Sequence, residues 1–135
     1  MISPNETPFE WERWEERFSV PEYVFGTEPN AFLKSQAGVL PKAGKALAIA
    51  DGEGRNGVWL AEHGLDVLSM DFSPTALAKA QALAQRRGVT LRTLQADITV
   101  WDWPDAEFDV VAAIFFQFLT SPERARVFAG IRCIE

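Results

Sequence analysis

The chain changes character near residue 45, where short apolar runs begin to alternate with helically spaced apolar positions. Residues 46–50 are apolar at every position, which is typical of a strand buried on both faces of its sheet. The same signals predict further strands at residues 65–70, 89–94 and 108–115. Helices are predicted before Gly64, from Ser73-Pro74 to Gly88, and over residues 121–131. Strands that alternate with helices predict a mainly parallel sheet with right-handed crossovers.

The first 44 residues are rich in aromatic and acidic side chains and lack this alternation. Aromatic residues at helical spacing predict a helix over residues 8–18 with one apolar face. A second helix is predicted to begin at Pro29-Asn30, because proline suits the first turn. No repeat or low-complexity tract divides the chain. We therefore predict one α/β domain over residues 1–135, with an N-terminal cover over 1–44 and a core over 45–135.

Composition narrows the possible partners. The formal net charge of −6 argues against broad contact with nucleic acid, which selects basic surfaces. The single cysteine, Cys133, excludes an internal disulfide framework and a cysteine-only metal site. No apolar run reaches the ~20 residues needed to cross a bilayer, and no secretory signal is visible at the start. We expect a cytoplasmic protein with no metal, nucleic-acid or membrane partner.

A glycine-rich turn follows the first predicted strand. Gly52, Gly54 and Gly57 have GxGxxG spacing and lie between a buried strand and a helix, which is the context that this motif requires. Glycines let a ligand lie against bare backbone, and the helix N-terminus offers free N–H groups. A plain glycine-rich connection between strand and helix remains the alternative. The turn therefore indicates a nucleotide-type ligand.

Two acids follow the next two predicted strands. Asp71 lies about 20 residues beyond the turn, where a carboxylate accepts hydrogen bonds from ribose hydroxyls. Asp97 follows the third strand and is placed to accept an adenine amino group, with Ile98 packing on the ring. Each acid has a simpler interpretation, Asp71 as a strand-end cap and Asp97 as part of a local turn. Together with the turn, they favour an adenosine-containing ligand.

Residues 51–61 and 67–73 resemble the class I S-adenosylmethionine-dependent methyltransferases, above all the tellurite-resistance-like and thiopurine-methyltransferase-like branch. The resemblance rests on the Gly-Glu-Gly-Arg-Asn-Gly turn and on the Met-Asp-Phe-Ser strand end. Residues 22–30 also resemble the N-terminal cover of that branch. The resemblance implies a Rossmann-like doubly wound sheet with N-terminal covering helices and S-adenosylmethionine as cofactor.

The resemblance also implies site residues. Those predicted to bind the cofactor are Asp51, Gly52, Gly54, Arg55, Asn56, Asp71, Phe72, Asp97, Ile98 and Phe115. Tyr23, Phe25 and Gln117 are predicted to lie near the methyl group and its acceptor, and Phe18 is a further aromatic candidate there. No catalytic residue is assigned, because methyl transfer from a sulfonium mainly requires alignment and exclusion of water.

The chain departs from the family pattern at three places. Ala48 and Ala50 stand where the family often has an acid and a glycine, so that Asp51 is left to hold the cofactor's amino group. Phe25 stands where a tyrosine is frequent. The chain ends at Glu135, after the fourth strand and its helix, which predicts a truncated sheet. The fourth strand would then be an apolar edge, suited to homodimer formation or to a fragment of a longer protein.

Three functional hypotheses follow. The leading one is an S-adenosylmethionine-dependent methyltransferase for a small-molecule acceptor, incomplete or weakly active because of the truncation. The second is a non-catalytic module that binds S-adenosylmethionine or S-adenosylhomocysteine. The third is an NAD-linked oxidoreductase, because the glycine turn and Asp71 suit both cofactors. Enzyme activity itself stays open at this point.

Overall fold

The computed structural model describes residues 15–97, 101 and 107–113. Its centre is a parallel sheet with the strand order β3-β2-β1-β4. The strands are β1 (Lys45–Ile49), β2 (Asp66–Asp71), β3 (Arg92–Gln95) and β4 (Val110–Ala113). The described helices are α2 (Ala31–Ser35), the 3-10 turn η1 (Ala37–Val39), α3 (Arg55–Glu62) and α4 (Pro74–Arg87). This order confirms the predicted α/β, Rossmann-like class.

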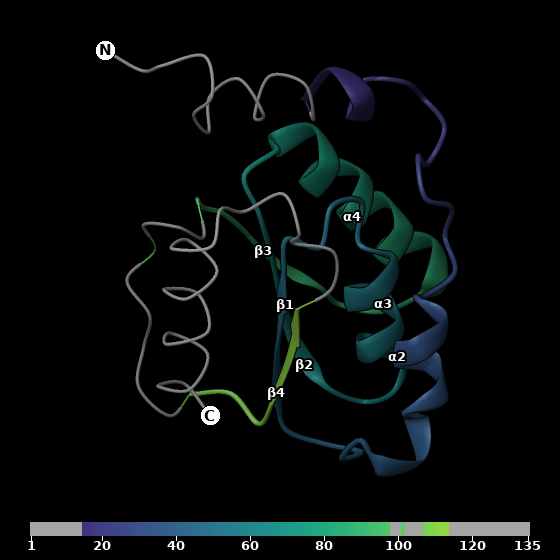
Figure 1. The fold of residues 1–135 in the computed structure, drawn as a ribbon, viewed down its shortest axis with the longest axis vertical. Coiled ribbons are helices and arrows are strands. Elements are labelled where there is room, and N and C mark those ends of the chain that lie inside the picture. The colour runs from purple at the N-terminus through teal and green to yellow at the C-terminus, as the bar shows by residue number, and fades with distance from the viewer. Residues whose placement is uncertain (1–14, 98–100, 102–106, 114–135) are drawn as a thin grey trace.

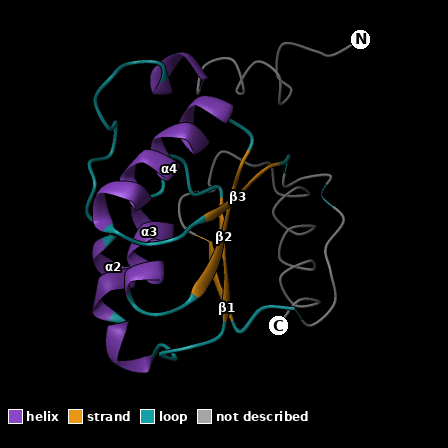
Figure 2. Ribbon diagram, turned by 180° about the vertical axis from the view of Figure 1, so that it is seen from behind, coloured by secondary structure: helices purple, strands orange, loops and turns teal. Residues whose placement is uncertain are grey.

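Helices α2, α3 and α4 lie together on one face of the sheet (Figures 1 and 2). The alternation of side chains along β1 explains how they pack. Ala46 and Ala48 belong to the core cluster beneath α3 and α4, where their small side chains let the helices approach. Leu47 and Ile49 point to the opposite face and pack with Met70 and Phe108. Strand β1 is therefore buried on both faces, as its apolar run predicted.

The predicted ends of α4 are confirmed. Ser73 Oγ accepts a hydrogen bond from the N–H of Ala76 at 3.0 Å, and Pro74 occupies the first turn. At the other end Gly88 has a φ of 72°, and Arg86 and Arg87 lie in the last turn. Helix α2 begins at Ala31, slightly later than predicted. Its N-cap is Asn30, whose side-chain oxygen accepts from the first-turn amides.

The starts of β3 and β4 differ from the prediction, and each of these differences has a local cause. Strand β3 begins at Arg92 because the N–H of Val89 is used by the end of α4, where it donates to Ala84 O at 3.0 Å. Strand β4 begins at Val110 because the N–H of Lys45 donates to the Asp109 side chain and not to a backbone carbonyl of the neighbouring strand. Residues 15–18 are helical, which agrees with the end of the first predicted helix. The helix predicted over residues 121–131 lies outside the described residues.

In residues 15–97, 101 and 107–113, no helix has the length and apolar character that a bilayer crossing requires. The same residues contain no group of three or more His, Cys, Asp or Glu side chains arranged to hold a metal ion.

Candidate functional site

The connection between β1 and α3 winds through a run of left-handed backbone conformations. Ala50, Gly52 and Gly54 have φ values of 50°, 59° and 90°. Glycine adopts such values at little cost, whereas an L-residue loses about 1–2 kcal/mol. Ala50 occupies the position where the resemblance expected a glycine, and the backbone keeps the left-handed form that a glycine would favour.

The later glycines of the turn are required by close packing within the protein. A Cβ at Gly54 would lie 2.5 Å from the Cβ of Ala80, so helix α4 packs directly on the turn. A Cβ at Gly57 would lie 2.5 Å from Asp51 Oδ2. The absence of a side chain at residue 57 therefore lets the Asp51 carboxylate reach the first turn of α3.

Asp51 is buried beneath the turn. Both of its carboxylate oxygens accept from the N–H of Gly57 at 3.2 Å, and Oδ2 also accepts from Ser69 Oγ at 2.7 Å. Burial raises the pKa of Asp51 to about 7, against the opposing effect of these hydrogen bonds. The carboxylate thus organises the turn from below, and its predicted contact with a cofactor amino group stays a prediction.

Asp71 ends β2 and joins the turn to the start of α4. Its Oδ2 accepts from the N–H of Gly52 at 2.9 Å, and its Oδ1 accepts from the N–H of Ser73 at 3.0 Å. Burial raises the pKa of Asp71, against these backbone hydrogen bonds. A carboxylate has about four lone-pair positions, so Asp71 retains acceptor capacity for a ligand hydroxyl. Its role as a cap and its predicted role as a ribose ligand are therefore compatible.

The ends of β2 and β3 meet beside Asp71. Its carbonyl oxygen accepts from the N–H of Ala96 at 3.0 Å, which brings the residues after β3 close to the end of β2. Gln95 Nε2 donates to the Phe72 carbonyl at 3.3 Å across the same gap. Phe72 and Asp97 are both partly exposed there. The structure thus places three predicted adenosine-site residues at one edge of the sheet, while Ile98, Phe115 and Gln117 lie outside the described residues.

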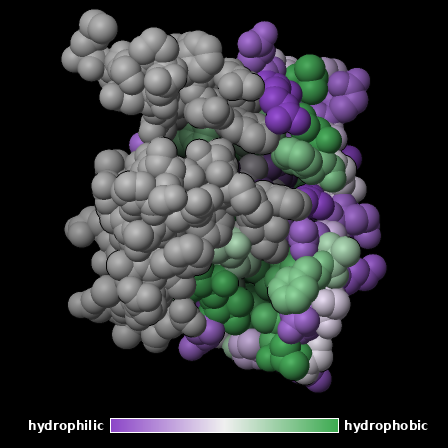
Figure 3. Space-filling model, in the orientation of Figure 1, coloured by the Kyte–Doolittle hydropathy of each residue, from purple (hydrophilic) through white to green (hydrophobic). Residues whose placement is uncertain are grey.

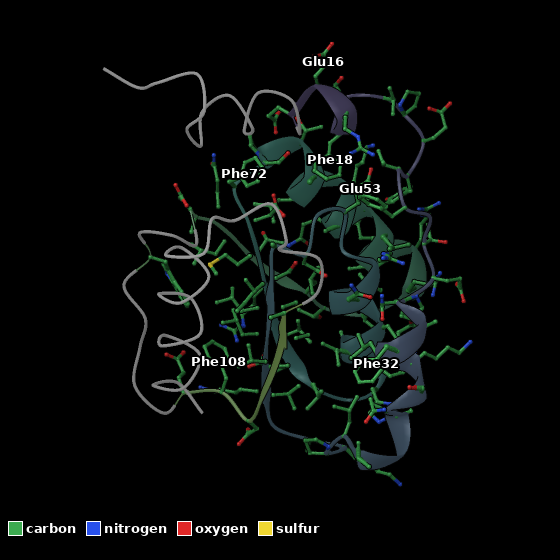
Figure 4. The ribbon with its side chains drawn as sticks, in the orientation of Figure 1. Glu16, Phe18, Phe32, Glu53, Phe72 and Phe108 are labelled. Atoms are coloured by element: carbon green, nitrogen blue, oxygen red, sulfur yellow. The ribbon has the colours of Figure 1, made fainter. Side chains whose placement is uncertain are left out.

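Phe18 lies over the glycine turn. Its side chain is 3% exposed, and its ring approaches within 3.4 Å of the position that a Cβ on Gly52 would occupy. Figure 4 shows Phe18, Glu53 and Phe72 at one end of the sheet, with Phe32 and Phe108 at the other. A helical residue of the N-terminal segment therefore covers the turn, as the cover interpretation expected.

Glu15 fixes the segment that carries Phe18. Its carboxylate accepts from Ser73 Oγ, and from Thr75 Oγ1 at 2.8 Å. Burial raises the pKa of Glu15, but the hydrogen bonds from Ser73 and Thr75 outweigh this effect and leave the pKa lowered. The first turn of α4 thereby holds the N-terminal segment beside the glycine turn.

Arg55 and Asn56 direct their side chains toward the N-terminal segment. Asn56 Oδ1 accepts from the N–H of Asn30 at 2.7 Å, and Arg55 Nη1 donates to the Glu28 carbonyl at 3.4 Å. The Arg55 guanidinium also lies 5.8 Å from the ring centroid of Phe25, which is 46% exposed. These contacts give both residues a structural role, and their predicted contacts with the cofactor stay predictions.

Tyr23 is held by α4. Its hydroxyl donates to the Lys79 carbonyl at 2.7 Å, and the cationic groups of Lys79 and Arg86 lie 5.7 and 5.2 Å from its ring centroid. The predicted places of Tyr23 and Phe25 near a methyl acceptor stay predictions.

Sequence reasoning missed Glu53, which lies inside the glycine turn and is buried. Its Oε1 accepts from the N–H of Val24, and its Oε2 forms an ion pair with Lys79 Nζ, both at 2.7 Å. Two features of the sequence could have indicated it. One is a charged residue between two glycines, and the other is a lysine among the small and apolar residues of one face of α4.

A family model described as a methyltransferase domain matches residues 46–134 of the chain. The chain belongs to the class I S-adenosylmethionine-dependent methyltransferases. The predicted family is thereby confirmed. S-Adenosylmethionine is the cofactor of this family.

Known proteins of the family share part of the sequence or the fold. A demethylmenaquinone methyltransferase from Thermus thermophilus is 39% identical over 79 residues, which cover 56% of this chain and 36% of that protein. The chain thus spans only a minor part of the length of this relative. A TehB-like methyltransferase from Corynebacterium glutamicum has a TM-score of 0.63 at 23% identity, covering 98% of this chain and 68% of that one.

A third similar protein was solved with ligands. Phosphoethanolamine N-methyltransferase 1 from Haemonchus contortus, in complex with phosphoethanolamine and S-adenosylhomocysteine, has a TM-score of 0.75. Its identity is 18%, and the match covers 98% of this chain and 31% of that one. At this identity the likeness shows the fold.

Proposed function

We propose that this chain binds S-adenosylmethionine at the carboxyl ends of β1, β2 and β3 and transfers its methyl group to a small-molecule acceptor. The observation that carries the proposal is the glycine turn, which Asp71 joins to the start of α4 through Gly52 and Ser73. Ligands of open α/β sheets bind outside the carboxyl ends of the strands, where this turn lies.

The arrangement suits an adenosyl ligand. Asp71 has unused acceptor capacity for ribose hydroxyls, and the partly exposed Phe72 and Asp97 lie beside it for the adenine. Phe18 covers the neighbouring Gly52, where we place the methionine part of the cofactor. The proposed acceptor is a small molecule, because the net charge of −6 disfavours nucleic acid. A cytoplasmic location belongs to the same proposal.

The bound cofactor would supply a methyl group on a positively charged sulfur, which leaves as a neutral thioether when the acceptor's lone pair forms the new bond. The protein has to align the acceptor with the methyl carbon and exclude water. The buried Phe18 suits exclusion of water at the turn. A neutral amine acceptor can attack without a general base and releases its proton after the transfer, whereas a thiol or hydroxyl acceptor has to lose its proton for the new bond to form.

Calorimetry with S-adenosylhomocysteine, S-adenosylmethionine and NAD tests the proposal. We expect the first two to bind and NAD to bind weakly or not at all. The Asp71→Ala variant should lose roughly 1.5–3 kcal/mol of S-adenosylhomocysteine binding, the size of a hydrogen bond to a charged group. Unchanged affinity of the Asp71→Ala variant would refute the ribose assignment. Tight binding of NAD alone would instead identify an oxidoreductase and refute the methyltransferase proposal.

A second candidate is a cofactor-binding module without turnover. Incubation with methyl-labelled S-adenosylmethionine and a panel of amine, thiol, hydroxyl and quinol acceptors separates the two candidates. Label transfer to one acceptor supports the enzyme, whereas cofactor binding with no transfer across the panel supports the module.

A further inference from the structure

Residues 22–30, within the N-terminal cover, form an arm without regular secondary structure that precedes α2. Side chains of the glycine turn, α3 and α4 bind the backbone of the arm at five points, in addition to the contacts of the Tyr23 and Glu28 side chains with α4. The backbone groups held in this way are Glu22 O, Val24 N, Thr27 O, Glu28 O and Asn30 N. The surface on this side of the molecule mixes hydrophobic and hydrophilic residues (Figure 3).

The ion pair between Glu53 and Lys79 is the buried centre of this attachment. The two side chains are 3% and 14% exposed, and Lys79 Nζ also donates to Glu22 O at 2.7 Å. Each oxygen of Glu53 has a separate partner, Val24 N on the arm and Lys79 on α4. Removal of one member of such a buried pair leaves an uncompensated buried charge and is therefore destabilising.

The arm is joined along the chain to the helical residues 15–18. It begins at residue 22, after three intervening residues, and Phe18 at the end of the helical residues rests on Gly52. Glu53 is the next residue of the same turn. Glu53 therefore connects the glycine turn directly to the arm at Val24 and to α4 at Lys79.

We infer that Glu53 is a positioning residue, which sets the position of the Phe18 cover over the methionine part of the cofactor. The inference rests on the proposed function, because it concerns a ligand at that turn. Glu53 acts on the arm, whereas Asp71 acts at the nucleoside end. Loosening the arm therefore weakens ligands that extend across Gly52 and spares those that end at the ribose.

The test compares S-adenosylhomocysteine with adenosine, measured by calorimetry on the same protein samples. Glu53→Gln keeps an acceptor for Val24 N but removes the charge that faces Lys79. We expect S-adenosylhomocysteine affinity to fall roughly tenfold, the equivalent of one hydrogen bond to a charged group, while adenosine affinity is unchanged. Lys79→Gln, which removes the other charge of the pair, should also lower the affinity for S-adenosylhomocysteine and leave the affinity for adenosine unchanged.

Hydrogen exchange supplies a second readout. In the wild-type chain, S-adenosylhomocysteine should slow exchange of the amides in residues 22–30, and Glu53→Gln should abolish this slowing. Asp66→Asn is the matched control, because it breaks an ion pair to Arg92 of similar length, 3.0 Å, on the exposed part of β2. The control should leave both affinities and the exchange pattern unchanged.

Two results would overturn the inference. Equal S-adenosylhomocysteine affinity in wild type and Glu53→Gln would show that the arm does not influence the cofactor. An equal loss for S-adenosylhomocysteine and adenosine would show general destabilisation instead of positioning. Failure of the wild-type chain to bind S-adenosylhomocysteine would instead refute the proposed function, and the inference would fall with it.

Discussion

Asp51 and Gly57 fit one another at the level of single atoms. The carboxylate of Asp51 occupies the space that a side chain at residue 57 would need. It accepts a hydrogen bond from the N–H of Gly57 there. The glycine spacing predicted a turn that approaches a ligand closely. In the structure, the third glycine allows a buried acid to approach the backbone instead. A motif thus predicts the backbone better than it predicts the reason for each glycine.

The buried Asp51 makes the stability depend on pH. Its pKa rises from an ordinary 3.8 to about 7 in the folded protein, so between these values the folded state retains a proton that the unfolded state has lost. Stability therefore falls as pH rises through this range, by at most about 1.4 kcal/mol per pH unit for one proton. Asp71 contributes in the same direction, because burial raises its pKa also.

Urea unfolding between pH 5 and pH 8 measures this dependence, with Asp51→Asn as the variant. The amide accepts from Gly57 and donates to Ser69 without a charge, so the variant should be more stable than wild type at pH 8 by about 1 kcal/mol or more. Its slope with pH should be smaller, with a remainder from Asp71. A wild-type stability that rises from pH 5 to pH 8 would contradict the assignment.

Ala50 stores strain in the first residue after β1. A φ of 50° costs an L-residue about 1–2 kcal/mol. Ala50→Gly removes this cost, but the greater conformational entropy of the unfolded variant offsets part of the gain. We expect Ala50→Gly to raise the free energy of unfolding by about 0.5–1 kcal/mol, measured by urea denaturation. Ala48→Gly, in the regular part of β1, is the control and should destabilise the protein.

At the scale of elements, helix α4 packs directly on the glycine turn at Gly54 and Ala80. Gly54→Ala adds a methyl group 2.5 Å from the Ala80 Cβ and places an L-residue at a φ of 90°. We expect a loss of about 2–4 kcal/mol in the free energy of unfolding, from overpacking and backbone strain together. Thermal and urea denaturation of the variant measure this loss.

The combination of Gly54→Ala with Ala80→Gly separates the two causes. The second change removes the methyl group at 2.5 Å but leaves the strained φ and the Cα of residue 80 at 2.8 Å, so the double variant should recover only part of the loss. The single variant Ala80→Gly measures the separate cost of a glycine within the helix, which should be about 1 kcal/mol. Strictly additive losses would argue that α4 does not rest on the turn.

The elements with strong local signals were predictable from the sequence. The apolar run of β1 and the two caps of α4 depend on adjacent residues, and the structure confirms them. The start of β3 was wrong, because the end of α4 uses the amide of Val89. Glu53 was missed because its partners, Val24 and Lys79, are far away in sequence and meet it only in the folded chain. Local patterns carry no information about such pairings.

At the scale of the molecule, β4 is an outer strand of the described sheet. The order β3-β2-β1-β4 gives it one described neighbour, β1. Its residues, Val110–Ala113, are all apolar, and an apolar strand at the edge of a sheet is a template for pairing with another strand. We therefore propose a homodimer that forms through the outer edge of β4, in keeping with the sequence prediction.

Light scattering over a range of dilutions tests the dimer. The proposal expects a molar mass twice the 15.1 kDa of the chain at high concentration and a decrease toward 15.1 kDa on dilution. Because backbone pairing shields amides, exchange at residues 110–113 should slow as the dimer forms. Residues 92–95 of β3, the opposite outer strand of the described sheet, should exchange at a rate independent of concentration. A mass of 15.1 kDa at every concentration would refute the dimer, and slowing at β3 alone would assign the contact to the other edge.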